Sequence, residues 1–148
     1  MFPNARLSEI VSLLATIDPV SQAAGTITTG WISAANHERF MALVQTGVLG
    51  ASATLDAKLQ QATDGTGTGA KDIAGKSITQ ILKASGDNKQ VEINVRADEF
   101  DVNGGFCYFR LSLTVGTAAS LVAASVMGVV GRQLPANSLN QAGVVQIV

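Results

Sequence analysis

Hydrophobic residues recur at every second position through most of the chain, which is the period of a β-strand with one buried face. The clearest run is 51–65, and the same alternation returns in 38–47, 90–98 and 106–116. A further run at 120–130 is apolar on both faces and predicts a last long strand. The residues expected to face a core are Phe40, Ala42, Val44, Ala53, Leu55, Ala57, Leu59, Val91, Ile93, Val95, Ala97, Phe109, Leu111, Leu113 and Val115.

Turn-forming residues separate these runs, at Asp64-Gly65, Gly86-Asp87-Asn88, Asn103-Gly104-Gly105 and Gly116-Thr117. Strands with polar outer faces and glycine or asparagine turns are typical of antiparallel two-sheet folds. The sequence therefore predicts a mainly β protein, an antiparallel β-sandwich or jelly roll, as one domain over residues 1–148. The order of the strands stays open, because alternation fixes faces and not neighbours.

The two ends of the chain differ from this pattern. Residues 5–16 carry apolar side chains at helical spacing, so we expect a short helix within an N-terminal arm at 1–25, ended by Pro19. Residues 132–148 are expected to form an extended tail whose last five residues are strand-like. Either end could contact a neighbouring subunit or complete the protein's own core. The candidate contact residues are Phe2, Leu7, Ile10, Val11, Leu14, Val144, Val145, Ile147 and Val148.

Residues 70–77 match the loose form of a phosphate-binding loop, a small residue and four others followed by Gly-Lys-Ser. A working loop of this kind follows a buried parallel strand and opens a helix. Here the preceding strand alternates, as half-exposed strands do. We therefore expect the segment 64–75 to be a mobile or interfacial loop, with no nucleotide or other cofactor.

Composition narrows the function further. The chain has 148 residues, 47% hydrophobic and 14% charged, with a net charge of −1. Such a balance gives no basic field for nucleic acid or an anionic membrane. The low charge suggests that a partner covers part of the surface, although a large core would give the same composition. The N-terminal residues do not resemble a secretory signal, and the one cysteine, Cys107, fits a reducing site of synthesis.

The sequence contains few candidates for catalytic or metal-binding side chains. His37 is the single histidine, and no Gly-x-Ser-x-Gly motif accompanies it, so we expect no catalytic residues and no enzyme. The acidic residues Asp98, Glu99 and Asp101 lack the spacing of a calcium loop, and no metal site is expected. Trp31 is either a core residue or an anchor in an interface.

Two segments resemble structural proteins of tailed bacteriophages. They are "GVLGASATLDAKLQQATDGTGTGAKDIAG" at 47–75 and "YFRLSLTVGTAAS" at 108–120, within a likeness that spans 26–127. The class they resemble is the jelly-roll capsid decoration, or cement, proteins. The resemblance implies a non-enzymatic virion protein on the outer capsid surface, made in the cytoplasm of a bacterial host. Its expected partners are the major capsid protein and further copies of itself, as a dimer or trimer.

Two alternatives use the same fold. One is a head–tail connector or a tail ring or tube subunit, which would be present in far fewer copies than a decoration protein. The other is a carbohydrate-binding module or adhesin. The aromatic content of 5% weighs against the latter, since sugar sites use exposed rings.

Overall fold

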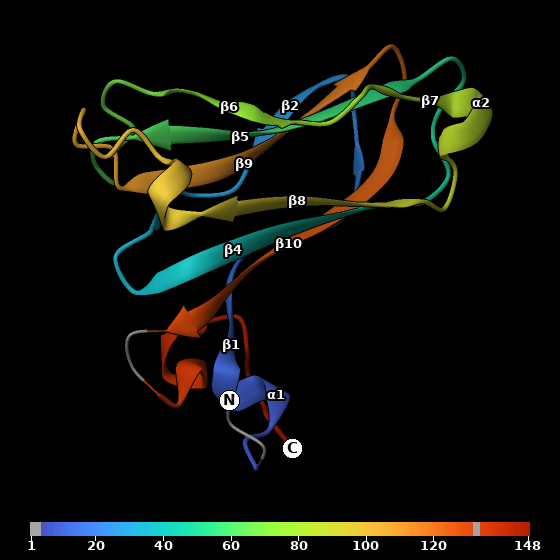
Figure 1. Cartoon of the computed structure of the whole chain (residues 1–148). Helices are drawn as coiled ribbons and strands as arrows, with labels where there is room; N and C mark the ends of the chain where they lie inside the picture. Colours follow the sequence, from blue (N-terminus) through green and yellow to red (C-terminus); the bar gives the residue numbers. More distant parts are fainter. Residues whose placement is uncertain (1–3, 132–133) are drawn as a thin grey trace.

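The computed structural model describes residues 4–131 and 134–148, and in them two antiparallel sheets face one another (Figure 1). One sheet is four-stranded, in the order β1-β10-β4-β8. The other has the order β2-β9-β5-β6, with β3 added beside β9 and β7 beside β5. The strands are β1 (Val11–Gln22), β2 (Gly25–Thr28), β3 (Ile32–Ser33), β4 (His37–Thr46), β5 (Thr54–Ala62), β6 (Lys71–Ser77), β7 (Ile81–Leu82), β8 (Gln90–Arg96), β9 (Tyr108–Gly116) and β10 (Ser120–Gly131).

The strand pairs are nested from the outside of the chain inward. β1 pairs with β10, β2 with β9, β4 with β8 and β5 with β6, all antiparallel. A long hairpin rolled into two sheets in this way is a jelly roll. The predicted fold class is therefore confirmed. The described residues also form four short helices: α1 (Leu7–Ile10), α2 (Lys83–Gly86), η1 (Ala97–Glu99) and η2 (Ala136–Leu139).

The core lies between the two sheets and is built from the alternating residues. Of the fifteen expected core residues, all but Val91 and Ala97 are buried, and Ala97 packs against the core while partly exposed. Phe40 of β4 and Phe109 of β9 meet across the sandwich with ring centroids 4.7 Å apart, and Phe100 joins both. Contacts of this kind between the facing sheets fix how the sandwich closes.

The predicted N-terminal helix is largely wrong. Only Leu7–Ile10 are helical, and Val11 to Gln22 form the strand β1 along β10. Pro19 does not end a helix, because it lies within β1 where the register shifts between Ile17 and Val20. An edge strand with a bulge tolerates proline, since no ladder hydrogen bond is lost there.

The tail prediction is also corrected. Residues 136–139 form the turn η2, which packs beside β1, and residues 144–148 have no regular secondary structure. Asn140 Oδ1 accepts a hydrogen bond from Leu13 N at 2.8 Å, and Gln141 N donates to Leu13 O at 2.8 Å. The segment therefore covers part of the outer edge of β1, which would otherwise expose unpaired backbone groups.

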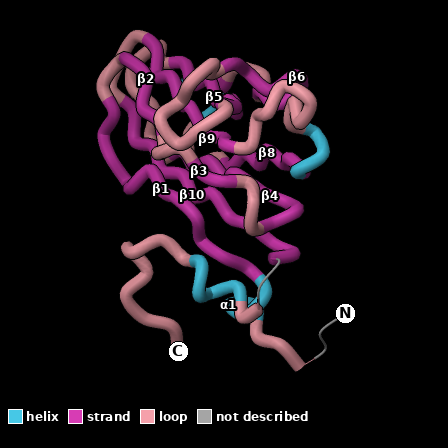
Figure 2. The backbone as a smooth tube through the Cα atoms, turned by 90° about the vertical axis from the view of Figure 1, so that its left-hand side faces the viewer, coloured by secondary structure: helices cyan, strands magenta, loops and turns pink. Residues whose placement is uncertain are grey.

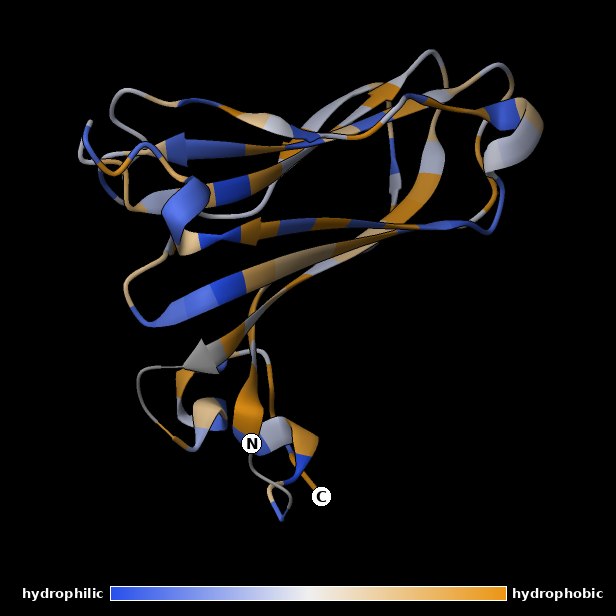
Figure 3. Cartoon of the chain, in the orientation of Figure 1, coloured by the Kyte–Doolittle hydropathy of each residue, from blue (hydrophilic) through white to orange (hydrophobic). Residues whose placement is uncertain are grey.

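Both described chain ends lie together below the sandwich, beside α1 and η2 (Figure 2). The long strands β1 and β10 reach down to them (Figure 1). Hydropathy follows the same extension: the lower part of β1 and the last residues of the chain are strongly hydrophobic (Figure 3). The jelly roll thus carries a terminal lobe with apolar residues of its own, formed by α1, the first residues of β1 and residues 134–148.

Candidate interaction surface

The face of the β1-β10-β4-β8 sheet that points away from the core is unusually apolar, and we call it the outer face. Its members are the residues that alternate with buried positions such as Ala42, Val44 and Val126. Each of these residues is partly or well exposed, so none of them is fully buried in the core. The apolar members are Val11, Leu13, Met41, Leu43, Leu121, Ala123, Met127 and Val129.

Polar side chains of the outer face lie along β8 and at both ends of β4, and Thr16 and Ser125 add two more in β1 and β10. Glu92, Asn94 and Arg96 alternate along β8, and Arg39 lies directly opposite Arg96. Arg96 is paired with Asp98, at 3.0 and 3.1 Å. Arg39 forms no ion pair within the described residues and is exposed. Glu38 and Asp98 line the same hollow as the two arginines, so this end of the face carries charges of both signs.

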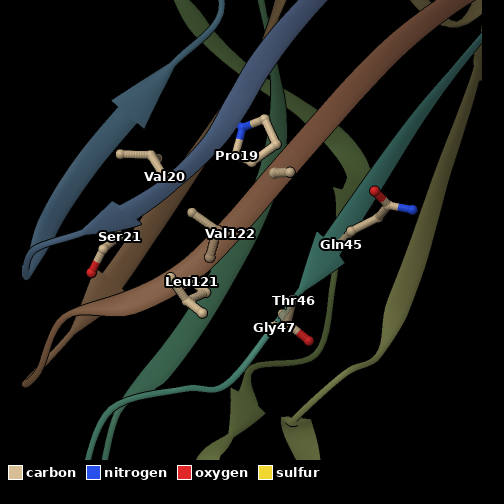
Figure 4. A pocket seen from close by; sticks show the side chains of 9 residues that line it. Pro19, Val20, Ser21, Gln45, Thr46, Gly47, Leu121 and Val122 are labelled. Atoms are coloured by element: carbon tan, nitrogen blue, oxygen red, sulfur yellow. The ribbon is translucent and has the colours of Figure 1, made fainter.

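Two mainly apolar hollows lie on the outer face of the described residues. The first, of about 390 Å³, lies between α1 and the sheet, and apolar side chains dominate its lining. The second, of about 370 Å³, lies over β1, β10 and the end of β4 (Figure 4). Pro19 and Val20 line it from β1, and Leu121 from β10. Shape and apolarity suit both hollows to side chains of another protein surface.

The predicted N-terminal contact residues separate in the structure. Leu7 is 71% exposed and lines the first hollow together with Val11. Ile10 is half-buried, and Leu14 packs against the core and is not available to a partner. Phe2 lies outside the described residues. The structure therefore brings Leu7 and Val11 to one surface and takes Leu14 away from it.

The predicted C-terminal contact residues remain on the surface. Val145 is 93% exposed, Val148 97% and Ile147 47%, whereas Val144 is partly covered. These residues do not complete the protein's own core. The C-terminal end of the chain and α1, which carries Leu7, lie in the same terminal lobe (Figure 2). Leu7, Val145 and Val148 are all well exposed there.

Trp31 serves an intramolecular role. The Arg110 guanidinium lies 4.5 Å from its ring centroid, and the glycine-rich loop passes over the indole. Gly67 meets Trp31, Gly65 meets the Tyr108 ring and Gly69 approaches the Phe106 ring. Only Gly67 lies too close to its ring to carry a side chain. Gly69 is favoured by its φ of +66°, and Gly65 leaves a β-carbon at ordinary contact distance.

Residues 70–77 match the phosphate-loop pattern but do not form a phosphate-binding site. Lys71 to Ser77 form the strand β6, which does not lead into a helix N-terminus. The prediction of a loop over 64–75 is therefore wrong for residues 71–75, and the loop ends at Ala70. Lys76 Nζ lies 2.9 Å from Glu99 Oε1, so its charge is already paired. The loop itself is organised by Asp64, whose Oδ1 accepts from Thr66 N, Thr66 Oγ1 and Thr68 N. These hydrogen bonds lower the pKa of Asp64 well below its usual range.

His37 is buried in a small polar chain beneath the sandwich. Its Nε2 lies 2.9 Å from Ser12 Oγ, which in turn donates to Ala136 O at 2.5 Å. Ser12 must therefore accept from His37 Nε2–H, which leaves Nδ1 unprotonated and without a partner among the described residues. Burial lowers the pKa of His37. The group links β4, β1 and η2, and Ser12 is too deeply buried to meet a substrate.

The acidic cluster forms ion pairs instead of a cation site. Asp98 binds Arg96, Glu99 binds Lys76, and Asp101 Oδ2 lies 2.6 Å from Lys71 Nζ. Within residues 4–131 and 134–148, no group of three or more His, Cys, Asp or Glu is placed to hold a metal ion. No helix that the structure describes has the length and apolarity to cross a membrane.

Comparisons with known proteins give weak likenesses of strand arrangement. No family model and no curated protein matches the chain. A chain of the Broad Bean Stain Virus structure has a TM-score of 0.49 at 10% identity, covering 84% of this chain and 88% of that one. The SPBc2 prophage-derived protein YomS has 0.43 at 7%, covering 80% and 92%. The CBM22-1 xylan-binding domain of Paenibacillus barcinonensis Xyn10C has 0.41 at 14%, covering 83% of each. Likeness at this level does not indicate what this chain binds.

The sequence did not identify Met41, Leu43 and Met127 as surface residues. A signal for them exists in the run 120–130, which is apolar on both faces although only one face can meet the core. Met41 and Leu43 occupy the positions of β4 that alternation assigns to solvent. An apolar residue at such a position is the sequence mark of a covered face.

Proposed function

We propose that this chain is a non-enzymatic structural protein of a tailed-phage virion, a capsid decoration protein that binds the outside of the shell. It would be made in the bacterial host cytoplasm and would join neighbouring major capsid subunits. The observation that supports this most is the terminal lobe, where Leu7, Val145 and Val148 are exposed apolar residues outside the sandwich. The likeness of 47–75 and 108–120 to decoration proteins supports it as well.

Exposed apolar ends on a rigid β-sandwich suit attachment to a preassembled shell. The jelly roll holds the lobe through β1 and β10, while the residues after Gln141 project from it. Binding would bury Val145, Ile147 and Val148, each of which contributes about 1.5–3 kcal/mol when an aliphatic side chain is fully removed from water.

The proposal is tested by co-sedimentation with expanded capsids of the phage that encodes the chain. We expect saturable binding by the whole chain and loss of binding by a chain stopped after Gln141. The matched control is Val48→Ser, which changes an exposed valine of the sandwich and should bind normally. Absence of binding by the whole chain would contradict the proposal. Six or twelve copies per particle, instead of hundreds, would indicate a connector or tail ring.

A further inference from the structure

We propose that protonation of His37 releases the C-terminal segment, residues 134–148, from β1 while the sandwich stays folded. The segment lies below the sandwich, where β1 begins and β10 ends (Figure 1). It carries Val145 and Val148, to which capsid binding is assigned. The inference therefore deepens the proposed function by making the position of these residues depend on pH, and it rests on that function only for its biological purpose.

Neutral His37 holds the segment through one hydroxyl group. His37 Nε2–H donates to Ser12 Oγ at 2.9 Å, and Ser12 Oγ donates to Ala136 O at 2.5 Å. All three residues are at most 1% exposed. These two hydrogen bonds join β4 to η2 through β1, and they leave His37 Nδ1 as a buried acceptor with no partner among the described residues.

A second proton would enter at Nδ1, where it would create a buried donor that carries a charge. The Phe40 ring centroid lies 6.0 Å from that of His37, and a β-carbon built at Gly128 would stand 2.8 Å from the His37 ring. Neither neighbour accepts a hydrogen bond from Nδ1. Because a buried charge without a hydrogen-bond partner is among the costliest groups in a protein, the protonated ring needs water, and its cover must open.

No buried carboxylate among the described residues of the surrounding elements compensates for this proton. The described parts of β10 and η2 contain no charged residue. Glu38 and Arg39, next to His37 in β4, are exposed, as is Asp18 of β1, which accepts from Thr16 Oγ1. Glu9 of α1 accepts from the Arg6 amide. The environment of His37 therefore favours the neutral ring.

The C-terminal segment is the part of this cover that can move at least cost. β10 lies between β1 and β4, and continuous ladders of backbone hydrogen bonds hold the three strands together. Apart from the Ser12 contact, the segment is attached to β1 by Asn140 and Gln141, which bind the backbone of Leu13, and by Gln141 Nε2, which lies 3.2 Å from Thr16 Oγ1. Release breaks these few contacts, whereas moving a strand breaks a whole ladder.

The test is hydrogen exchange of the isolated whole chain at pH 7 and pH 5, with rates corrected for the intrinsic effect of pH. The amides of Leu13 and Gln141 report release of the segment, and the amide of Leu113 reports unfolding of the sandwich. Burial lowers the pKa of His37, so the released state binds the proton more readily. Since a released His37 has its ordinary pKa of 6.5, the two reporter amides should exchange up to about 25-fold faster at pH 5. Leu113 should remain far slower than both.

Two variants identify the titrating group. His37→Gln should abolish the acceleration, whereas the matched control Asp18→Asn removes an exposed carboxylate of β1 and should keep it. As the chain has a single histidine, the midpoint of the acceleration in the wild type can also be compared with the NMR titration of the His37 ring, even if His37→Gln does not fold. The two midpoints should coincide.

Three results would overturn the inference. They are reporter amides that ignore pH, an equal acceleration in folded His37→Gln, and exchange of Leu113 as fast as that of Leu13 and Gln141, which would mean that release requires unfolding of the whole sandwich. Capsid binding without the pH response would leave the proposed function standing. A pH response in a chain that binds no capsid would keep the switch and remove that function.

Discussion

Gly67 lies against the indole of Trp31, so closely that a β-carbon built at Gly67 would stand 2.5 Å from Trp31 Nε1. The backbone of Gly67 also has a φ of +92°, a conformation that side chains of other residues rarely adopt. Two independent constraints thus require glycine here. The glycine-rich segment around Gly67 therefore packs over the side chain of Trp31.

Gly67→Ala should lower the free energy of unfolding by about 2 kcal/mol, through backbone strain and displacement of the indole. Urea unfolding followed by Trp31 fluorescence measures this directly. Gly65→Ala is the control, since its β-carbon would stand 3.4 Å from the Tyr108 ring and no positive φ is needed there. Equal stability of the two variants would contradict the explanation.

Acidification should destabilise the protein through His37. Burial lowers the folded-state pKa below the usual 6.5, so the unfolded chain binds the proton more readily. The stabilising contribution of neutral His37 is complete above pH 6.5 and is lost as the pH falls from there through the folded-state pKa. Urea unfolding at pH 7 and pH 5 should show this loss.

His37→Gln is the comparison for that measurement, because it removes the titrating group. Its stability should change less than that of the wild type between pH 7 and pH 5. The paired carboxylates, including Asp72 and Asp101, have lowered pKa values and lose their contribution only at more acidic pH. An identical pH dependence in both proteins would rule out His37 as the cause.

Asn140→Ala should lower the free energy of unfolding by about 1 kcal/mol, because Leu13 N loses its acceptor at the edge of β1. Hydrogen exchange at the Leu13 amide should also accelerate. Asn137→Ala, in the neighbouring turn η2, serves as the control and should leave that amide protected. Protection of Leu13 in both variants would show that the C-terminal segment does not cover the edge.

Lys76→Ala should lower the stability of the protein, and neither the wild type nor the variant should bind nucleotide. Loss of the partly buried ion pair with Glu99 should lower the free energy of unfolding by about 1 kcal/mol. Native mass spectrometry with magnesium-ATP should give no stoichiometric adduct for either the wild type or the variant. An adduct that Lys76→Ala removes would revive the nucleotide hypothesis.

The strands in the middle of the chain could be predicted because alternation with a period of two indicates which side chains are buried. Leu55, Leu59, Leu111 and Leu113 are all fully buried, as their positions in the pattern require. The prediction of an N-terminal helix failed beyond Ile10, because the apolar residues Val11 and Leu14 also fit a bulged strand. Pairing of Val11 with Val129, far along the chain, decided between the two.

The candidate interaction surface could likewise be predicted from the sequence only in part. Exposure of Val145, Ile147 and Val148 could be suspected from the sequence, since an apolar chain end needs a partner of some kind. The outer face as one surface could not be assembled from the sequence, because it combines residues from four strands that are distant along the chain, such as Met41 and Met127.

The sequence by itself determined the β-class, most core faces and most turns, since these depend on local alternation and on residues that favour turns. The tertiary structure alone decided that β1 joins β10, that the glycine loop covers aromatic rings and that Met41 lies beside Met127. The physical reason is that alternation specifies the direction of a side chain, whereas strand order and register depend on hydrogen bonds between segments that only folding brings together.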